Sequence, residues 1–332
     1  MVTMKDIAKI AGVSHSTVSR ALNNDPRISP ETTAKVRRIA SEYGYSLDIR
    51  GRVLAKGQTF TIGLAIPNIT DEFFLPIIRG VEHQASEYGY SLVLCSTRGD
   101  TRFELEAIRL MSERRVGGLI IAWTDDFFEI VHKLHPQESP VVFIGNVTGD
   151  SPYPSIDCDH RSGAYDATKH LAELGHKHIT FLSGPLSSID SRERLRGYTQ
   201  AIHEYKLVTD VWEGDYARAS GYMQGRKILS KTQRPSAIFA ANDWMAMGVM
   251  AAAKELGMLV PEELSVVGFD DVSPARHLLV PLTTVRQPAQ EMGKIAVKML
   301  LKQSENDQLH RRIVLPTKLV VRKTTGPARD TN

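Results

Sequence analysis

The sequence predicts an α/β protein in which a small all-α head of three helices precedes a two-lobed body of doubly wound parallel sheets. Its 332 residues exceed the length of one ordinary domain, so two or more domains are expected. Helical signals fill residues 4–43, and from residue 60 onward short apolar runs alternate with amphipathic stretches. Alternation of this kind is typical of βαβ units, whose parallel strands are covered on both faces by helices.

Composition excludes several other classes of protein. Hydrophobic residues make up 42% and charged residues 24% of the chain, as in ordinary globular proteins and unlike disordered ones. The longest apolar run, residues 245–253, is shorter than the ~18 residues that span a bilayer, and residues 1–6 lack the apolar segment of a secretory signal. Cys95 and Cys158 have neither CxxC nor metal-ligand spacing. We therefore expect a cytoplasmic protein without disulfides, metal or cofactor.

Charge is distributed unevenly, although the net charge of the whole chain is only +3. Residues 1–58 contain ten Lys and Arg against five Asp and Glu, whereas the rest of the chain contains 31 and 33. A basic head on a slightly acidic body is typical of a protein whose head binds a polyanion such as nucleic acid. A surplus this small also occurs on ordinary solvated surfaces, so charge by itself does not distinguish the two.

Three helices are predicted in the head from their start and stop signals. The first covers residues 4–11 and ends at Gly12, which suits the left-handed position after a helix. Ser14 can cap a second helix, which ends before an Asn-Asn-Asp-Pro run. A capping serine, a proline and an acid at residues 29–31 mark the start of a third helix, which ends near residue 43.

The first two helices have the pattern of a helix-turn-helix. Their apolar residues would pack into one interior, while the polar residues of the second helix gather on the opposite face. Such a helix can enter the major groove of DNA, where Arg20 could bond to a guanine edge. The residues expected to contact bases or phosphates are Ser14, His15, Ser16, Thr17, Arg20 and Asn23. An αα-hairpin with a solvated outer face is the alternative that involves no DNA.

Alternating strands and helices are predicted throughout the body. The strands are expected over residues 61–66, 91–96, 118–122, 141–145, 179–182, 237–240 and 265–269. The helices are expected over residues 72–88, 101–114, 160–174, 191–204, 242–256 and 288–301. These units are too many for one small sheet, so we expect two lobes with a crevice between them.

Residues 2–23 closely resemble the DNA-binding head of the lactose-repressor/galactose-repressor (LacI/GalR) family of bacterial transcriptional regulators. The resemblance continues along the chain through short motifs, among them Leu-Gly-His at 174–176, Ala-Asn-Asp at 241–243 and Val-Gly-Phe-Asp-Asp at 267–271. It implies a homodimeric repressor that binds a pseudo-palindromic operator in double-stranded DNA and no membrane. It also implies a body similar to periplasmic sugar-binding proteins, in which a small effector, a sugar in our interpretation, controls the affinity for DNA.

The resemblance also implies a division of the chain. We expect a DNA-binding domain over residues 1–45 and a hinge over residues 46–59. The N-lobe is expected over residues 60–159 with 288–318, and the C-lobe over residues 160–287 with 319–328. In the family the hinge forms a short helix that wedges a leucine into the minor groove; Leu54 occupies that position, with Arg52 nearby for phosphate or groove contact. Gly51 stands where alanine is usual, which predicts a weak hinge helix, and a plain flexible tether is the alternative.

Candidate effector-binding residues follow the carboxyl ends of strands, where open α/β sheets bind their ligands. Aromatic side chains there could stack on a sugar ring, and Arg, Asn and Asp could bond to its hydroxyl groups. By resemblance, the effector would be held by Arg192, Asn242 and Asp270, with the pocket lined by Phe73, Trp123, Asn146, Tyr216 and Gln287. Asn242 and Asp270 could instead only cap helices, and Trp123 and Tyr216 could only pack against the lobe edge.

Other functions remain open beside a sugar-responsive repressor. Catalysis is not expected, since the chain contains no Walker A, HExxH or GxSxG motif and no GxGxxG after a strand. A purine-like corepressor could strengthen DNA binding where a sugar inducer would weaken it. A solute-binding protein of a transporter is a further alternative, against which the basic head and the missing signal argue. No heptad tail follows Arg322, so we expect a dimer rather than a tail-assembled tetramer.

Overall fold

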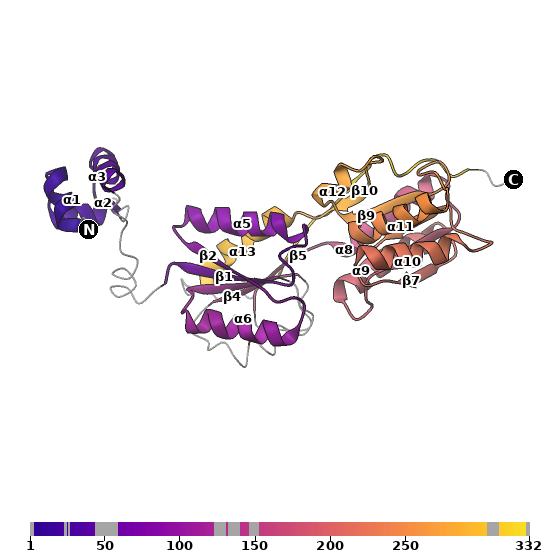
Figure 1. Cartoon of the computed structure of the whole chain (residues 1–332), viewed down its shortest axis with the longest axis horizontal. Coiled ribbons are helices and arrows are strands. Elements are labelled where there is room, and N and C mark those ends of the chain that lie inside the picture. The colour runs from indigo at the N-terminus through magenta and orange to yellow at the C-terminus, as the bar shows by residue number, and fades with distance from the viewer. Residues whose placement is uncertain are drawn as a thin grey trace. The chain divides into compact units, whose positions relative to one another are not determined.

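The computed structural model describes residues 3–22, 25, 27–43, 59–122, 131, 140–145, 153–303 and 312–329 (Figure 1). The chain divides into two compact units, Met1–Phe60 and Thr61–Asn332. None of the described helices is long and apolar enough to cross a membrane. Five residues with predicted contacts lie outside the described residues: Asn23, Arg52, Leu54, Trp123 and Asn146.

The first unit contains three helices whose bounds follow local capping signals: α1 (Met4–Ala11), α2 (His15–Leu22) and α3 (Pro30–Glu42). Thr3 and Asp6 cap α1 reciprocally, since the Asp6 N–H donates to Thr3 Oγ1 at 3.4 Å and the Thr3 N–H donates to Asp6 Oδ2 at 2.8 Å. Gly12 follows α1 at φ +66°, in the left-handed region that favours glycine. Ser14 Oγ accepts from the Thr17 N–H at 3.0 Å, so Ser14 caps α2 as predicted.

The three helices enclose one small apolar core. Its buried members are Ile7, Ala8, Ala11, Val18, Ala21, Val36 and Ile39. Val13 and Leu22, which the sequence pattern also assigns to this interior, lie partly buried against it. Because α2 buries only Val18 and Ala21, its polar face is directed away from the core.

The first sheet of the body is parallel and has the strand order β11-β5-β4-β3-β1-β2. Its strands are β1 (Thr61–Ile66), β2 (Ser91–Ser96), β3 (Gly118–Ala122), β4 (Val141–Ile144), β5 (Ser155–Cys158) and β11 (Arg312–Leu315). The helices on it are α5 (Phe74–Glu87), α6 (Thr101–Glu113) and α13 (Ala289–Gln303). Helices α5 and α13 lie on one face of the sheet and α6 lies on the other (Figure 1).

Alternate residues of these strands point into two separate cores. This explains why the sequence of each strand is apolar on both faces. Ile62 and Leu64 belong to the core beneath α5 and α13. Ala65 and Leu119 belong to the core against α6, to which α6 contributes Met111. Complete burial of one such large side chain stabilises the fold by about 1.5–3 kcal/mol, so the two cores fix the register of the sheet.

The second sheet has the strand order β12-β10-β9-β8-β6-β7 and is parallel except for β12, which pairs antiparallel with β10. Its strands are β6 (Ile179–Ser183), β7 (Asp210–Glu213), β8 (Ala237–Ala240), β9 (Ser265–Asp270), β10 (Thr283–Arg286) and β12 (Lys318–Val320). Its helices are α8 (His160–Glu173), α9 (Ile189–Glu204), α10 (Arg218–Leu229), α11 (Asp243–Glu255) and the short α12 (Ser273–Arg276). The predicted pair of doubly wound sheets is thus confirmed, with one antiparallel edge strand.

Helices α8 and α11 lie on opposite faces of this second sheet. A Cβ on Gly163 of α8 would lie 3.1 Å from the ring of Phe269, whereas a Cβ on Gly268 would lie 2.2 Å from Asp243 at the start of α11. Adjacent residues of a strand point to opposite faces, so the sheet is covered on both sides. In such a sheet every parallel strand ends, and the next helix begins, at the same edge. The side chains that follow the strands therefore lie close together at that edge.

Several elements were not predicted from the sequence. They are β5, β7, β10, β11, β12, α10 and α12. The five strands have three or four residues each and all contain polar or charged residues, whereas β4 and β8, which are equally short but entirely apolar, were predicted. Helix α10 contains Gly221 and Gly225, which lower helix propensity but allow close packing, since a Cβ on Gly221 would lie 2.3 Å from the Met245 carbonyl oxygen.

Candidate functional site

The outward face of α2 carries the side chains predicted to contact DNA. His15, Ser16 and Arg20 are exposed, as recognition of base edges requires. Ser14 Oγ lies 2.8 Å from both Ser16 Oγ and Thr17 Oγ1, so the hydroxyl that caps the helix also orders its first turn. The structure places Ser14, His15, Ser16 and Thr17 at the start of α2 and Arg20 in its last turn, and the contacts of these residues with DNA remain a prediction.

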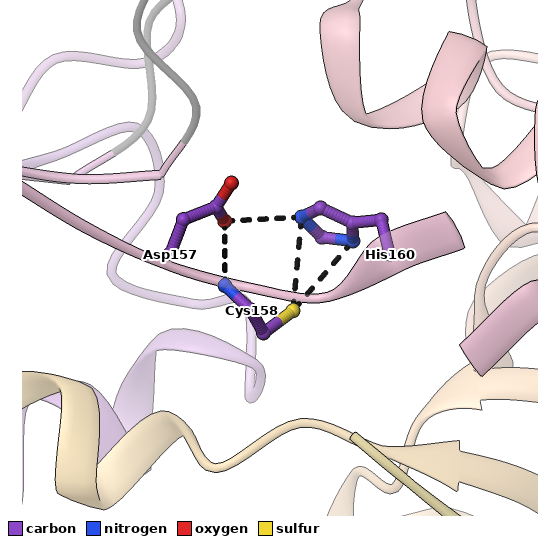
Figure 2. Close-up of side chains that lie close together, drawn as sticks. All are labelled: Asp157, Cys158 and His160. Carbon is purple, nitrogen blue, oxygen red and sulfur yellow. Dashed lines mark hydrogen bonds and ion pairs between the residues drawn. The ribbon is translucent and has the colours of Figure 1, made fainter. Parts of the chain in front are cut away.

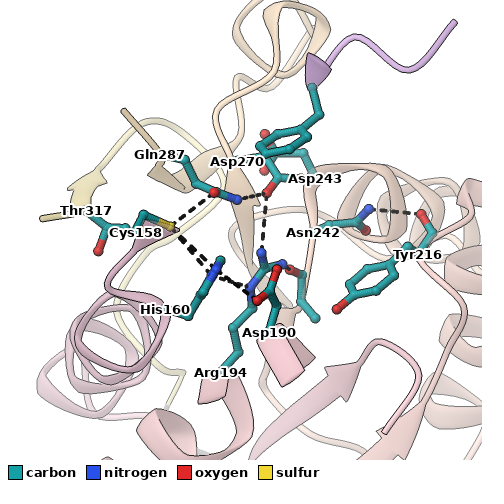
Figure 3. Close-up of polar contacts among 12 residues, drawn as sticks. Cys158, His160, Asp190, Arg194, Tyr216, Asn242, Asp243, Asp270, Gln287 and Thr317 are labelled. Carbon is teal, nitrogen blue, oxygen red and sulfur yellow. Dashed lines mark hydrogen bonds and ion pairs between the residues drawn. The ribbon is translucent and has the colours of Figure 1, made fainter. Parts of the chain in front are cut away.

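In the body, polar side chains converge beyond the carboxyl ends of the second sheet, around the completely buried Arg194 (Figure 3). Arg194 Nε donates to His160 Nδ1 at 3.3 Å, and Nη1 donates to the carbonyl oxygen of Ala241. The guanidinium lies 4.0 Å from the centre of the Phe269 ring, and Nη2 lies 3.9 Å from Asp270 Oδ1. Nη2 has no hydrogen-bond partner among the described residues, which leaves a buried charged donor directed into the cluster.

Asp270, the last residue of β9, connects this arginine to a chain of hydrogen bonds. Gln287 Nε2 donates to Asp270 Oδ1 at 2.7 Å, and the Cys158 thiol donates to Gln287 Oε1 at 3.1 Å. Burial raises the pKa of Asp270 to about 7 although the charge of Arg194 opposes the change. The carboxyl group is therefore partly protonated near neutral pH and can donate as well as accept.

His160 lies between this series of hydrogen bonds and two further carboxyl groups. Its Nε2 is 3.2 Å from Asp157 Oδ1 and 3.3 Å from Asp190 Oδ1. Burial alone would raise the pKa of Asp190, but the neighbouring His160 and Arg194 lower it below its usual value, so Asp190 remains a carboxylate. The sequence did not point to His160 or Asp157, because they become neighbours of Asp190 only when β5, α8 and α9 assemble.

Asn242 and Tyr216 lie at the side of the cluster. Asn242 Oδ1 accepts from the Met245 N–H at 2.9 Å, so Asn242 caps α11, and its contact with an effector stays a prediction. Its Nδ2 donates to the carbonyl oxygen of Tyr216 at 2.9 Å. The Tyr216 ring packs over Gly184, where a Cβ would lie 2.2 Å from it, and its centre is 5.9 Å from the Arg194 guanidinium. Tyr216 thus lines the cluster with its ring.

Phe73 approaches from the first sheet. It lies at the start of α5, is nearly completely buried and contacts Phe74 edge to face, with ring centres 5.1 Å apart. A small cavity of about 10 Å³, the space of one water molecule, lies between the two lobes here. Its lining comes from both sheets: Phe73, Phe74, Ile77, Ala122, Ile144, Gly145, Asp157, His160, Asp190, Gln287 and Met292.

A hydrogen bond joins the two lobes beside this cavity. Trp244, in the first turn of α11, donates from Nε1 to Asp71 Oδ1 at 3.1 Å, and Asp71 belongs to the loop between β1 and α5. The same Asp71 oxygen accepts from the Phe73 N–H at 3.0 Å. The loop that carries Phe73 is therefore tied to the lobe that carries Arg194.

Arg192 does not lie in this cluster, contrary to the prediction. Its Nη1 donates to the carbonyl oxygens of Leu186 at 2.9 Å and Ser187 at 2.5 Å, in the loop before α9. Arg194 takes the predicted place, because successive buried positions of a helix are three or four residues apart. The signal was present in the sequence, since Arg194 belongs to the buried stripe of Asp190, Ser191, Arg194, Gly197, Tyr198, Ala201 and Ile202.

Comparison with known proteins covers both units. A family model described as bacterial regulatory proteins, lacI family, matches residues 3–48, and a periplasmic binding protein-like domain matches residues 168–325. The HTH-type transcriptional repressor PurR of Vibrio atlanticus is 33% identical over 98% of this chain and 98% of its own. The ribose operon repressor of Escherichia coli is 36% identical over 91% of this chain and 92% of its own.

Solved structures agree with these sequence matches. The lac repressor dimer bound to operator and the anti-inducer ONPF superposes with a TM-score of 0.81 at 33% identity, over 98% of this chain and 99% of that chain. A LacI family transcriptional regulator from Enterococcus faecium with bound ribose superposes with a TM-score of 0.72 at 25% identity, over 81% of this chain and 100% of that chain. With its head, its body and its full length all matched in this way, the chain belongs to the lacI family of bacterial regulatory proteins.

Proposed function

We propose that this protein is a homodimeric transcriptional repressor whose affinity for its operator falls when a monosaccharide binds at Arg194. The observation that carries the proposal is the buried Nη2 of Arg194, a charged donor without a hydrogen-bond partner in the described part of the chain. A buried charged donor is costly unless a ligand or another group satisfies it. A sugar hydroxyl supplies the matching acceptor.

The surrounding groups favour a neutral, hydroxyl-rich ligand over an anion. Asp190 and Asp270 flank Arg194 and would repel a carboxylate or phosphate, but both accept hydrogen bonds from hydroxyl groups. The ring of Phe73, which lines the cavity, and the ring of Tyr216 near Arg194 offer apolar faces to the carbon side of a sugar. The ribose operon repressor of Escherichia coli and the Enterococcus faecium regulator with bound ribose supply the analogy for a monosaccharide.

Entry of a sugar requires a change in the arrangement of the two lobes. A cavity of about 10 Å³ is far smaller than a monosaccharide, so side chains or whole lobes have to move apart before it binds. The hydrogen bond between Trp244 and Asp71 lies at the boundary that opens. A sugar changes operator affinity only as far as it binds one arrangement of the lobes better than the other.

On the DNA side, α2 supplies the reading surface. His15, Ser16 and Arg20 would contact base edges of a half-site, while Ser14 and Thr17 would contact phosphates. A homodimer presents two such helices, so the two half-sites are about 34–36 Å apart or a multiple of that distance. The contacts of Asn23, Arg52 and Leu54, and the pocket roles of Trp123, Asn146, Asn242 and Gln287, belong to the same proposal.

The experiment compares two arginines on one helix, Arg194→Met and Arg192→Met. The operator is first selected from random DNA duplexes with the wild-type protein. Mobility-shift titrations with D-ribose and other pentoses and hexoses then measure how much sugar makes each full-length protein release the operator. Arg194→Met should bind operator normally but bind the sugar about 10- to 150-fold more weakly, the loss of one to two charge-assisted hydrogen bonds. Arg192→Met should respond like the wild type.

Two results would refute parts of this proposal. If Arg194→Met responds to sugar like the wild type while Arg192→Met does not, the site assignment is wrong. If the sugar that binds raises the affinity for operator instead of lowering it, the sugar acts as a corepressor, and the proposed release of the operator by the sugar is refuted.

A further inference from the structure

We propose that His160 is a positioning residue, which holds the guanidinium of Arg194 in the orientation that sugar binding requires. His160 lies at the crossover from β5 to α8, where the chain passes from one lobe to the other (Figure 2). One nitrogen of its buried ring faces Arg194, and the other faces Asp157 and Asp190. The inference rests on the sugar-binding function proposed above and names a residue that acts on the sugar only through Arg194.

The contact with Arg194 fixes the direction of the whole guanidinium. The ring nitrogen Nδ1 of His160 accepts the Arg194 Nε–H at 3.3 Å. A guanidinium is planar and rigid, so a bond to Nε also sets where its two terminal nitrogens point. Nη1 then donates to the carbonyl oxygen of Ala241, and Nη2, which has no hydrogen-bond partner among the described residues, points into the cluster. His160 therefore aims the donor that the proposed sugar would use.

Two carboxyl groups fix the other ring nitrogen. His160 Nε2 lies 3.2 Å from Asp157 Oδ1, in β5, and 3.3 Å from Asp190 Oδ1, in the first turn of α9. Because Nδ1 accepts from Arg194, the ring proton belongs on Nε2, where it can donate to these two oxygens. The ring is thus held at both nitrogens, and its neighbours set its tautomer.

Electrostatics support the same arrangement. Burial lowers the pKa of His160, but the acidic neighbours, above all Asp190, outweigh burial and raise the pKa. A more basic ring is a better hydrogen-bond acceptor, so the carboxylates strengthen the bond to Arg194 from the far side of the ring. Asp157 is held in turn by Arg312, whose Nη2 lies 3.6 Å from Asp157 Oδ2.

Packing prevents the ring from turning away. Cys158 Sγ lies 3.7 Å from each ring nitrogen of His160, as Figure 2 shows. The Phe269 ring also packs near it, with ring centres 5.8 Å apart and an angle of 30° between the two planes. His160 is the first residue of α8 and is only 3% exposed, so its backbone and its ring are both fixed. Arg194 is therefore oriented before a sugar arrives, which lowers the entropic cost of binding.

Direct contact between His160 and the sugar is the other role that its position allows, because His160 lines the cavity between the lobes. Both ring nitrogens are already engaged, Nδ1 with Arg194 and Nε2 with the carboxyl groups. A histidine has no further polar atom that could bond to a sugar hydroxyl. The geometry therefore favours action through Arg194 over direct contact.

The test is a double-mutant cycle on the full-length protein, with His160→Phe and Arg194→Met made singly and together. Calorimetric titration measures the affinity for D-ribose, or for whichever pentose or hexose releases the operator. Phenylalanine keeps a ring but cannot bond to Arg194, so His160→Phe should bind the sugar about 5- to 30-fold more weakly. In the Arg194→Met background the same substitution should change the affinity less than about twofold, because no guanidinium is left to orient.

A conservative variant separates hydrogen bonding from bulk and from charge. His160→Gln carries a donor and an acceptor in one neutral side chain, and its affinity should recover to within about threefold of the wild type. His178→Gln is the matched control, since His178 is 37% exposed and bonds to Asp210 outside the cluster; it should bind the sugar like the wild type. Circular dichroism checks that each variant is folded, and His160→Leu replaces His160→Phe in the cycle if the latter does not fold.

Two outcomes would overturn the role of His160 alone. One is a further loss of fivefold or more when His160→Phe is added to Arg194→Met, since His160 would then act on the sugar without Arg194. The other is equal affinity of His160→Gln and His160→Phe, since the hydrogen-bonding atoms would then not matter. If Arg194→Met by itself keeps the wild-type affinity, the sugar-binding function proposed above is wrong, and this inference falls with it.

Discussion

Replacing Asp270 by asparagine should make the free energy of unfolding less dependent on pH. The wild-type side chain is only 7% exposed, and burial raises its pKa from 3.8 to about 7. Asparagine has the same shape, keeps an acceptor for Gln287 Nε2 and is among the residues that best tolerate the positive φ of 120° at this position. The substitution therefore removes this titration, and it also removes a charge that helps to raise the pKa of the buried Asp243.

The sign follows from proton binding in the two states. Between pH 3.8 and about 7 the folded protein keeps a proton on Asp270 that the unfolded chain releases, so a rise in pH through this window destabilises the folded state. The full change corresponds to about 4 kcal/mol, at 1.36 kcal/mol for each unit of pKa. Between pH 5 and pH 8 the wild type should therefore lose about 2–3 kcal/mol relative to Asp270→Asn.

The assay is urea denaturation at pH 5, 6, 7 and 8, followed by the fluorescence of Trp212 and Trp244, which both lie in the same lobe as Asp270. Glu262→Gln, which removes an exposed carboxylate from that lobe, is the matched control and should show no such trend. A difference between wild type and Asp270→Asn that is constant from pH 5 to pH 8, or that favours the wild type as pH rises, would refute the reasoning.

Two further predictions concern packing and the boundary between the lobes. Gly80→Ala should lower the free energy of unfolding by about 1–3 kcal/mol, because a Cβ there would lie 2.1 Å from the Gln290 carbonyl oxygen where α5 crosses α13; urea denaturation measures this, with the exposed Ser86→Ala on α5 as control. Trp244→Phe should strengthen sugar binding about 2- to 10-fold, because it removes the hydrogen bond to Asp71 that holds the lobes in the arrangement whose cavity is too small for a sugar; calorimetric titration with the sugar that releases the operator measures this.

Each of these predictions has a contradicting outcome. Unchanged stability of Gly80→Ala would mean that the two helices separate without loss of packing. Equal sugar affinity of Trp244→Phe and the wild type would mean that the bond to Asp71 does not distinguish the open from the closed lobes.

Local sequence was enough to predict the architecture. Ser14 and Gly12 each act on neighbouring backbone groups, so the turn between α1 and α2 follows from four or five residues. The long strands with two apolar faces likewise reveal parallel sheets, because both faces must be covered. Short strands that contain polar residues, such as β7 and β10, could not be predicted, because they lack the apolar run that revealed the equally short β4 and β8 and are ordered by their neighbours in the sheet.

The composition of the site was only partly predictable. The sequence predicted that the site follows the carboxyl ends of strands, and this rule selected Asp270 and Gln287, which the structure joins by a hydrogen bond. The rule does not say which side of the next helix faces the crevice, and there the sequence interpretation selected Arg192 in place of Arg194. Two residues along a helix differ by about 200° in direction, so the error moved the charge to the other side of α9.

The sequence alone thus determined the helix-turn-helix, the alternation of strands and helices, and the edge of the sheet at which ligands bind. Each of these depends on capping hydrogen bonds and on apolar patterns that extend over only a few neighbouring residues. Only the tertiary structure decided that His160, Asp190 and Arg194 share one buried site and that Asp157 and Cys158 adjoin it. Those contacts join β5, α8 and α9, and their energies depend on burial and charge that do not exist until the lobes have folded.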